Sequence, residues 1–572
     1  MPGGLLNIIS YGNQNIILNG NPSKTFFKTV YAKYSNFGIQ KFQLDYTGLR
    51  NLQLNEDSMY SFKIPRNAEL LLDTYLAFDL PDIWSPIIPP VDVKDKWRPY
   101  NFRWINDIGT NIIKNITLSI GGQIIQTYSG EYIKNMVERD FTQSKKDHFY
   151  KMSGMTPELT FPDYAYWRYD SYPNSFYIPP EPNKVYVGPE PAIRGRRIYV
   201  PLHFWFSYST KMALPLTCLQ YSEVQIDITL RPIYDLFTIN DVSLTVEQGF
   251  SLNNIRPNPN NDSHSLYRFL QPPPDIYLNA SSYGNKMTTW ASNIHLIATY
   301  CFLSEEEGRV FAKNEQKYLI KDIKEDLFTN TTGTQRVKLY SSGLASSWLW
   351  YFRRSDISLR NEWSNYTNWL YKDVIPYDII EAPTTSSLIN PELGNIGPGF
   401  NYISMYTLGI GNKGSMEYVK EPSGLYINPV LNDANRKLIM SKMSIIFDGK
   451  YRENEFDAGI YNYIEKYKMS DGSSDDGLYT YNYTLHTNPY DLQPSGAINL
   501  SKFKTIELEF ITIKPPLDPT AQSLTICDTT GTIIGSVNPS SIYMYNYDLK
   551  FIEERYNIIR FISGQAGLVY AR

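Results

Sequence analysis

The sequence predicts an all-β protein built from antiparallel sheets, with short helices and long surface loops. Aromatic residues make up 15% of its 572 residues, and Tyr, Phe and Trp fit the half-buried surface of a pleated sheet. The 34 glycines and 36 prolines imply many turns. Four segments alternate between apolar and polar residues, as a strand with one buried face does: 116–120, 224–230, 479–485 and 506–510.

Alternation with polar residues on the outer face is typical of antiparallel sheets. Strands do not alternate with helices along the chain, which argues against doubly wound and α/β-barrel folds. Two short helices are expected. One spans Glu131 to Phe141, with Ile133 and Val137 on its apolar face. The other follows Ser304, where three glutamates complete a capping box.

A weak internal repeat divides the chain into two similar halves. Each half has a hairpin turn, a helical pattern, an aromatic strand, a Leu/Pro turn and an alternating strand. In the first half these are Gly121-Gly122, 130–141, 203–206, 214–216 and 224–230. In the second half they are Asp448-Gly449, 459–467, 479–483, 492–494 and 505–510. The repeat favours two related β-domains, with chance similarity between β-domains as the alternative.

The expected organisation is an arm followed by two domains. The arm covers residues 1–24, the first domain 25–240 and the second domain 241–572. A Pro-rich tract at 253–274 reads as a linker. Long loops at about 151–195 and 371–440 are expected to be functional surfaces at one solvent-facing end.

The arm ends before a strand expected at Thr25 to Tyr31. Its frequent glycines disfavour an isolated helix, while its Leu and Ile pairs are poorly placed in free solvent. Docking under its own domain or onto a neighbouring protein is therefore expected, with a frayed terminus as the alternative.

Composition excludes several function classes. With 54 basic and 58 acidic residues the net charge is −4, which argues against a dedicated nucleic-acid binder. The 5 histidines and 3 widely spaced cysteines form no CxxC or HExxH motif, which argues against structural or catalytic zinc. The few cysteines fit a reducing compartment. No signal peptide and no run of 18 apolar residues is visible, so a soluble chain is expected.

Four local motifs could carry chemistry, but each has a plainer interpretation. Gly409 to Gly414 matches GxGxxG without a following helix, which favours a flexible loop. Asp471 to Gly477 resembles a calcium loop but lacks its spacing and terminal Glu, which favours a surface turn. The cluster Arg194 to Arg197 is interpreted as a solvated loop or a subunit contact, and His203 as a structural histidine.

The sequence therefore predicts no catalytic residue, no cofactor-binding residue and no metal ligand. It contains neither a GxSxG elbow nor a Walker A motif. Carboxylates distant along the chain can still meet in space, so a carboxylate pair stays open.

A series of short motifs, in order over nearly the whole chain, resembles the major capsid proteins of nucleocytoplasmic large DNA viruses, most of all the mimivirus branch. The motifs include Gly3-Gly4-Leu5-Leu6, Asn19-Gly20-Asn21-Pro22, Ile64-Pro65-Arg66-Asn67, Ile120-Gly121-Gly122-Gln123, Ala213-Leu214-Pro215-Leu216, Leu219-Gln220-Tyr221-Ser222, Gln493-Pro494-Ser495-Gly496, Tyr556-Asn557-Ile558-Ile559 and Gly564-Gln565-Ala566-Gly567. The sequence departs from the family at Ala32 to Ser35, where Arg-Arg-His-Thr is common, and before Ser346, where a His-Pro is missing. These departures concern capsomer contacts and leave the expected fold unchanged.

The resemblance implies two consecutive eight-stranded antiparallel jelly rolls, a double-sheet sandwich architecture that suits the predicted strands. It implies a non-enzymatic structural virion protein, three copies of which form one pseudo-hexagonal capsomer of an icosahedral shell. Implied partners are copies of itself, minor capsid and penton proteins and internal membrane-associated proteins, without direct nucleic-acid contact. The arm would lie at the inward-facing base. Assembly would take place in the host cytoplasm.

Two alternatives remain. A scaffold with the same double jelly roll, shed on maturation as in poxviruses, would be absent from mature virions. A carbohydrate-acting β-sandwich enzyme would need two carboxylates about 5–10 Å apart in a cleft.

Overall fold

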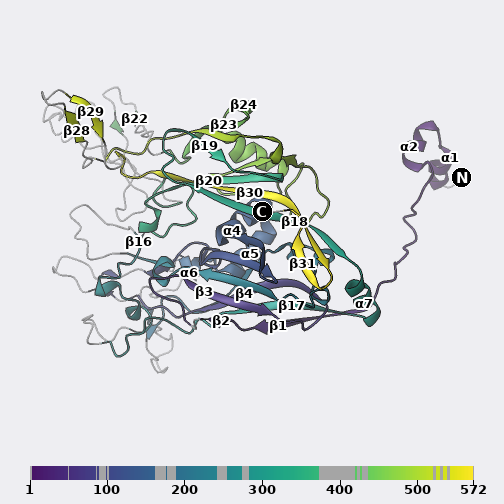
Figure 1. Ribbon diagram of the computed structural model, residues 1–572, viewed down its shortest axis with the longest axis horizontal. Helices are drawn as coiled ribbons and strands as arrows, with labels where there is room; N and C mark the ends of the chain where they lie inside the picture. The colour runs from purple at the N-terminus through teal and green to yellow at the C-terminus, as the bar shows by residue number, and fades with distance from the viewer. Residues whose placement is uncertain are drawn as a thin grey trace.

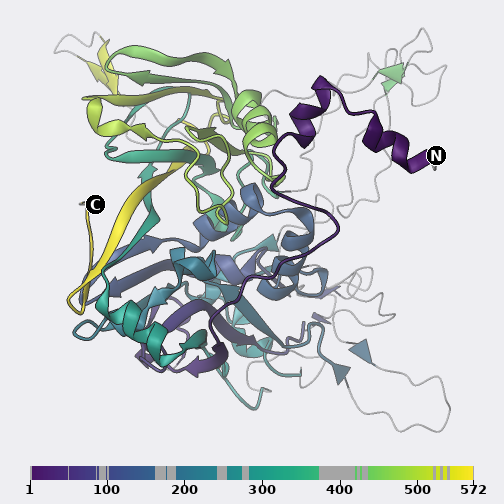
Figure 2. The ribbon, with the colours of Figure 1, turned by 90° about the vertical axis from the view of Figure 1, so that its right-hand side faces the viewer.

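The computed structural model describes most of the chain as two β-sandwiches that lie side by side (Figure 1). The described ranges are 3–48, 51–85, 102–160, 189–240, 254–272, 283–372, 436–518 and 542–570, with short strand segments at 87–88, 98–99, 175–176, 419–420, 426–427, 524–527 and 533–537. Figure 2, which is turned by 90° from Figure 1, shows the same two sandwiches.

The first sandwich consists of two antiparallel sheets. One has the order β1 (Phe37–Leu44), β17 (His295–Leu303), β4 (Leu70–Leu80) and β12 (Arg196–Pro201), with β13 (Leu214–Pro215) also on β4. The other has the order β2 (Thr47–Gly48), β3 (Ser58–Ile64), β14 (Val224–Leu230), β8 (Ile113–Ile120) and β9 (Gln123–Tyr128). A small side sheet joins β16 (Asn254–Ile255), β15 (Phe237–Asn240) and β7 (Phe102–Trp104).

The second sandwich repeats this plan. One sheet has the order β18 (Gln316–Phe328), β30 (Tyr547–Ile562), β20 (Leu344–Arg354) and β25 (Leu478–Asn482), with β26 (Ile498–Asn499) on β20 and β31 (Gln565–Leu568) on β30. The other has the order β19 (Thr334–Leu339), β27 (Ile506–Thr512), β23 (Met440–Phe447) and β24 (Lys450–Asp457).

The two sandwiches share one topology. When the eight long strands of each are numbered along the chain, both sandwiches have the order 1-8-3-6 in one sheet and 2-7-4-5 in the other. This interleaving of early and late strands is a jelly roll. The prediction of two consecutive jelly rolls is therefore confirmed.

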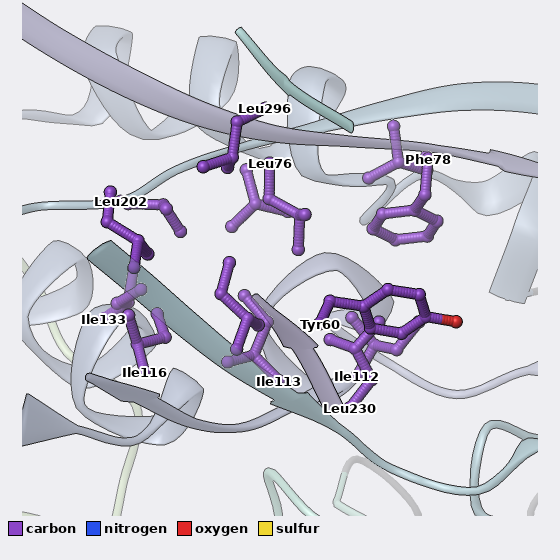
Figure 3. Close-up of a cluster of buried hydrophobic side chains, with 14 of the residues drawn as sticks. Tyr60, Leu76, Phe78, Ile112, Ile113, Ile116, Ile133, Leu202, Leu230 and Leu296 are labelled. Atoms are coloured by element: carbon purple, nitrogen blue, oxygen red, sulfur yellow. The ribbon is translucent and has the colours of Figure 1, made fainter. Parts of the chain in front are cut away.

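The core of the first jelly roll fills the space between its sheets (Figure 3). Leu76 and Phe78 from β4 face Tyr60 from β3 and Leu230 from β14, and all four are buried. Strict alternation in Val224–Leu230 turns every second side chain into this core. The second core is rich in aromatic rings. It contains Trp348, Trp350 and Phe352 from β20, which alternate in the same way.

Strand β17 belongs to the first jelly roll. It pairs with β1 and with β4, and its Leu296 lies in the first core (Figure 3). The expected domain boundary at 240 would separate β17 from both partners, so we propose a boundary just after Leu303. The sequence does not indicate that β17 belongs to the first jelly roll, because β17 does not alternate between apolar and polar residues and follows β14 only after a long excursion of the chain.

The Pro-rich tract expected to be a linker is packed where it is described, at 254–272. Phe269 is fully buried, and its ring centroid lies 5.4 Å from that of Phe102. Its carbonyl accepts a hydrogen bond from the Trp84 N–H at 2.9 Å. The tract therefore covers the side of the first jelly roll; of its described prolines, Pro257 is buried, whereas Pro259 and Pro272 are exposed.

The helices connect strands or cover sheet ends. They are α3 (Ile108–Asn111), α4 (Gly130–Asp140), α5 (Gln143–Ser153), α6 (Pro157–Thr160), α7 (Glu305–Lys313) and α8 (Glu465–Met469). Both helices expected from the sequence, α4 and α7, form. The Ser304 side chain accepts from the Glu307 N–H at 3.4 Å and caps α7. Among the described helices, none is long and apolar enough to cross a bilayer.

The N-terminal arm differs from the expectation: it extends beyond residue 24 up to the first strand, and its described part is residues 3–36. Gly3–Ile9 and Ile16–Asn19 are helical in spite of their glycines. Thr25 to Tyr31 forms no strand, because it has no neighbouring strand edge to satisfy its backbone, and the first strand begins at Phe37. The arm leads away from the sandwiches at the end that holds α7 (Figure 1).

Most of the two expected loops, at 151–195 and 371–440, and the glycine motif at 409–414 lie outside the described residues. The described part of the first loop includes the end of α5 and helix α6.

Candidate functional site

Helix α4 lies between the two sandwiches, and all of its residues are buried (Figure 1). Five of them are charged: Glu131, Lys134, Glu138, Arg139 and Asp140. A buried charge is costly unless it is paired and hydrogen-bonded. The partners of these five side chains therefore determine how the two jelly rolls fit together. We call this contact region the seam.

Arg139 connects the first jelly roll to the central strand β30 of the second. Its Nη2 lies 2.8 Å from Oε1 of Glu554 and 2.7 Å from Oδ2 of Asp140. Glu554 also accepts the Tyr132 hydroxyl at 2.9 Å and the Ser347 hydroxyl at 2.6 Å. Burial alone would raise the pKa of Glu554, but Arg139 and Lys321 outweigh it and lower the pKa to about 2. Glu554 is therefore held as a carboxylate.

Glu131 joins side chains from both jelly rolls at the start of α4. Its Oε1 accepts from Arg353 at 2.8 Å and from Arg231 at 2.9 Å, while its Oε2 accepts the Tyr351 hydroxyl at 2.5 Å. Arg231 follows β14 of the first sandwich, and the other two donors lie on β20 of the second. Burial alone would raise the pKa of Glu131, but Arg353 and Arg231 outweigh it and lower the pKa to about 2.

The loop at 471–477 completes the seam from the second jelly roll. The Lys134 ammonium lies 3.0 Å from Asp475 and 3.2 Å from Asp107 of its own sandwich. The Gly472 N–H donates to the Arg139 carbonyl at 2.9 Å. This loop packs onto α4 and its Asp475 binds lysines, while Asp471 and Ser473 stay exposed, so the expected surface turn also takes part in the seam. Within the described ranges, no three His, Cys, Asp or Glu side chains are arranged to hold a metal ion.

His203 lies at the edge of the seam. It is buried, its ring stacks on Tyr208 with centroids 5.8 Å apart, and burial together with nearby Lys145 lowers its pKa to about 3. With Trp205, Asp140 and Glu554 it lines a cavity of about 100 Å³. Three carboxylates line this cavity: Asp140 and Glu554 both contact Arg139, and Asp491 lies 2.7 Å from His486.

The arginine cluster at 194–197 lies partly in β12. Arg197 donates to both oxygens of Asp79, at 2.6 and 2.8 Å. Arg196 lies 3.6 Å from Glu158. These two arginines are thus paired within the chain, and a subunit contact by the cluster stays a prediction.

The arm is the second candidate functional surface. Its large apolar side chains are exposed, and Phe26 and Phe27 reach 87% and 98%. Exposed apolar side chains gathered on one segment mark an interaction site. Sequence analysis found the arm but missed the seam. One signal was available: Glu553 and Glu554 interrupt the apolar run of β30, as buried ion pairs do.

Comparisons with known proteins agree with this architecture. The family model "Major capsid protein N-terminus" matches residues 25–302, and "Large eukaryotic DNA virus major capsid protein" matches residues 307–567. The chain is 23% identical to the major capsid protein of Phaeocystis pouchetii virus and 24% identical to that of Paramecium bursaria Chlorella virus 1, over 100% of each chain in both cases. It is 27% identical to capsid protein 1 of Acanthamoeba polyphaga mimivirus over 56% of this chain and 44% of that protein.

Solved structures show the same fold. The quasi-atomic model of the PBCV-1 virus capsid aligns with a TM-score of 0.57 at 18% identity, covering 96% of this chain and 100% of that one. The Faustovirus major capsid protein aligns with a TM-score of 0.56 at 13% identity, covering 94% and 93%.

Proposed function

Since this chain belongs to the family of large eukaryotic DNA virus major capsid proteins and forms capsids in the virion, we propose that three copies make one pseudo-hexagonal capsomer of an icosahedral shell. Three chains with two similar sandwiches each present six similar units. Such a unit tiles a hexagonal lattice while keeping closed three-fold symmetry.

The observation that carries this proposal is the repeated strand order together with the seam. The two jelly rolls of one chain can occupy two of the six similar positions in a pseudo-hexagonal capsomer only if their relative position is fixed. Arg139, Glu131 and Lys134 of the first sandwich fix this relative position, because each forms an ion pair with a residue of the second sandwich. Such buried pairs tolerate little displacement, because a separated partner would be left charged and unpaired.

The test is electron cryo-microscopy of the purified full-length protein and of particles that contain it. We expect three-fold particles with six similar densities, two from each chain. Density for a single chain with two independently tilted sandwiches would contradict the proposal.

We further propose that the arm contacts minor capsid proteins at the inner face of the shell, and that penton and internal membrane-associated proteins are additional partners. The arm supports this because its apolar side chains are exposed and nothing in the described part of the chain covers them. It also lies at the end of the molecule opposite to β28 (Leu524–Cys527) and β29 (Ile533–Val537), so it can face inward while that end faces outward (Figure 1).

We propose a purely structural role without catalysis and without direct nucleic-acid contact. The ion-paired state of the seam carboxylates and the net charge of −4 support it. Assembly in the host cytoplasm is also proposed. Cys218 and Cys301 are free thiols, which suits a reducing compartment. Neither the scaffold alternative nor the enzyme alternative is favoured, because the relatives are named major capsid proteins.

A further inference from the structure

Strand β1 has an open edge with little charge. Among the described strands it pairs only with β17, so its other edge presents backbone N–H and C=O groups to solvent. Its sequence from Phe37 to Leu44 contains one charged residue, Lys41. Residues 37–41 are exposed, and Phe37 and Ile39 are 53% and 55% exposed. An uncharged open edge of this length is a template for another strand.

One of the open sheet edges of the second jelly roll is protected differently. Strand β24 ends the sheet β19-β27-β23-β24, and five of its eight residues are charged: Lys450, Arg452, Glu453, Glu455 and Asp457. Charged side chains on an edge strand prevent strand addition. This contrast favours an assembled protein in which another strand covers the edge of β1 and the edge of β24 stays uncovered.

A covering strand would extend an apolar surface that already exists. Phe37 and Ile39 pair with Leu303 and Cys301 of β17, so they lie on the same face as these residues. Cys301 belongs to a small apolar cluster with Leu70 and Ala213, against which Leu303 packs. Phe37 and Ile39 continue this cluster into solvent.

The arm contains a segment suited to this edge. Thr25 to Tyr31 reads Thr-Phe-Phe-Lys-Thr-Val-Tyr, which is rich in the β-branched and aromatic residues that favour strands. Among the residues that the structure describes it has no strand partner, and its apolar side chains are almost fully exposed. A strand-forming segment without an edge and an edge without a strand thus occur in one chain.

We propose that residues 25–31 of a second copy add to the open edge of β1 as an extra strand. This inference rests on the proposed homotrimer. In a closed three-fold ring every copy donates one arm and receives one, so all three β1 edges are covered. The twelve residues 25–36 can span at most about 40 Å, enough to cross to a neighbouring copy.

Pairing of the segment with its own β1 is disfavoured. It would require residues 32–36, Ala-Lys-Tyr-Ser-Asn, to reverse the chain without any Gly or Pro. The arm instead runs outward from the start of β1 (Figure 1).

Disulfide trapping in the full-length protein tests the proposal. Thr29→Cys and Gln40→Cys place one thiol on the arm segment and one on β1, in a Cys527→Ser background; native Cys218 and Cys301 are buried. Oxidation should give covalent dimers and trimers on a non-reducing gel only when both new thiols are present. Companion variants with the arm thiol at Phe27 or Tyr31 sample other registers. Thr29→Cys with Arg452→Cys on β24 is the matched control and should stay uncross-linked.

Light scattering on the same samples separates the possible failures. A trimer in which all three arm positions give no interchain disulfide, or only an intrachain one, overturns the strand addition and leaves the homotrimer intact. A monomer overturns the homotrimer and with it the strand addition. Ile39→Lys provides a second readout. It should weaken trimers at least tenfold while the monomer melts within about 2 °C of the parent, because Ile39 is half exposed; unchanged trimer affinity would contradict the proposal.

Discussion

The Arg139 guanidinium on the buried helix of the first jelly roll lies 2.8 Å from the Glu554 carboxylate on the central strand of the second. The two residues are 415 positions apart in sequence, and each side chain is only 1% exposed. Their contact makes the orientation of one sandwich depend on the other.

Removing the cation at the centre of the seam should destabilise the protein strongly. Arg139→Met leaves Asp140 and Glu554 buried without their main counter-ion, and we expect a loss of about 3–5 kcal/mol in the free energy of unfolding. Urea denaturation followed by tryptophan fluorescence measures it. The matched control is Arg309→Met, which removes an exposed ion pair with Glu305 on α7 and should cost less than about 1 kcal/mol. Equal losses for both variants would contradict the role of the seam.

The seam should weaken in acid. The pKa of both Glu131 and Glu554 is lowered to about 2, whereas an unfolded glutamate titrates near 4.3. A lowered folded pKa gives stability that is fully present above the unfolded pKa and is lost as the pH falls through the folded pKa. Burial raises the pKa of Asp140, which partly offsets this loss. We therefore expect the melting temperature to fall between about pH 4.5 and pH 2.

Calorimetry across that range checks the acid prediction. In Glu131→Gln one of the two titrating carboxylates is absent, so this variant should show a shallower decline than the parent. A parent melting temperature that stays constant from pH 4.5 to pH 2 would be incompatible with the assignment.

Gly472 should be needed for the loop at 471–477 to reach α4. A Cβ atom at Gly472 would lie 2.5 Å from the carbonyl oxygens of both Glu138 and Arg139, which is too close for backbone atoms that cannot move aside. Gly472→Ala should lower the melting temperature by several degrees, measured by differential scanning fluorimetry. Gly284→Ala is the control, because its Cβ would have nothing within 4 Å. If both variants melt like the parent, the loop does not dock as described.

Deleting residues 2–20 should leave soluble trimers but weaken attachment at the inner face of the shell. The deletion removes α1 (Gly3–Ile9) and α2 (Ile16–Asn19), whose exposed Leu and Ile side chains contact neither jelly roll. Residues 25–31 remain in place. In a competition experiment the truncated protein should enter particles less efficiently than the full-length protein, and equal incorporation would show that this part of the arm has no assembly role.

The fold was largely predictable because its strongest signals are local. Alternation in Val224–Leu230 depends only on which face each residue occupies, and the strand forms with those bounds. The membership of β17 was not predictable, since it depends on pairing with β1 more than 250 residues earlier. The seam was missed for the same reason: the helix at 130–140 reads as amphipathic, and only the distant Glu554 and Arg353 make its charged face an interior one.

The arm shows the opposite case: its local sequence favours a strand, but the single chain provides no neighbouring strand among its described residues. Thr25 to Tyr31 has the composition of a strand, yet an isolated segment cannot satisfy its backbone groups and remains without strand structure. The expectation of a strand there was wrong for the single chain, and the proposed strand addition would explain why the sequence favours one.

Light scattering coupled to size-exclusion chromatography, on the full-length protein at micromolar concentration, tests the capsomer proposal most directly. We predict a single species with three times the chain mass of 66.1 kDa, stable on tenfold dilution. A stable monomer at that concentration would contradict it.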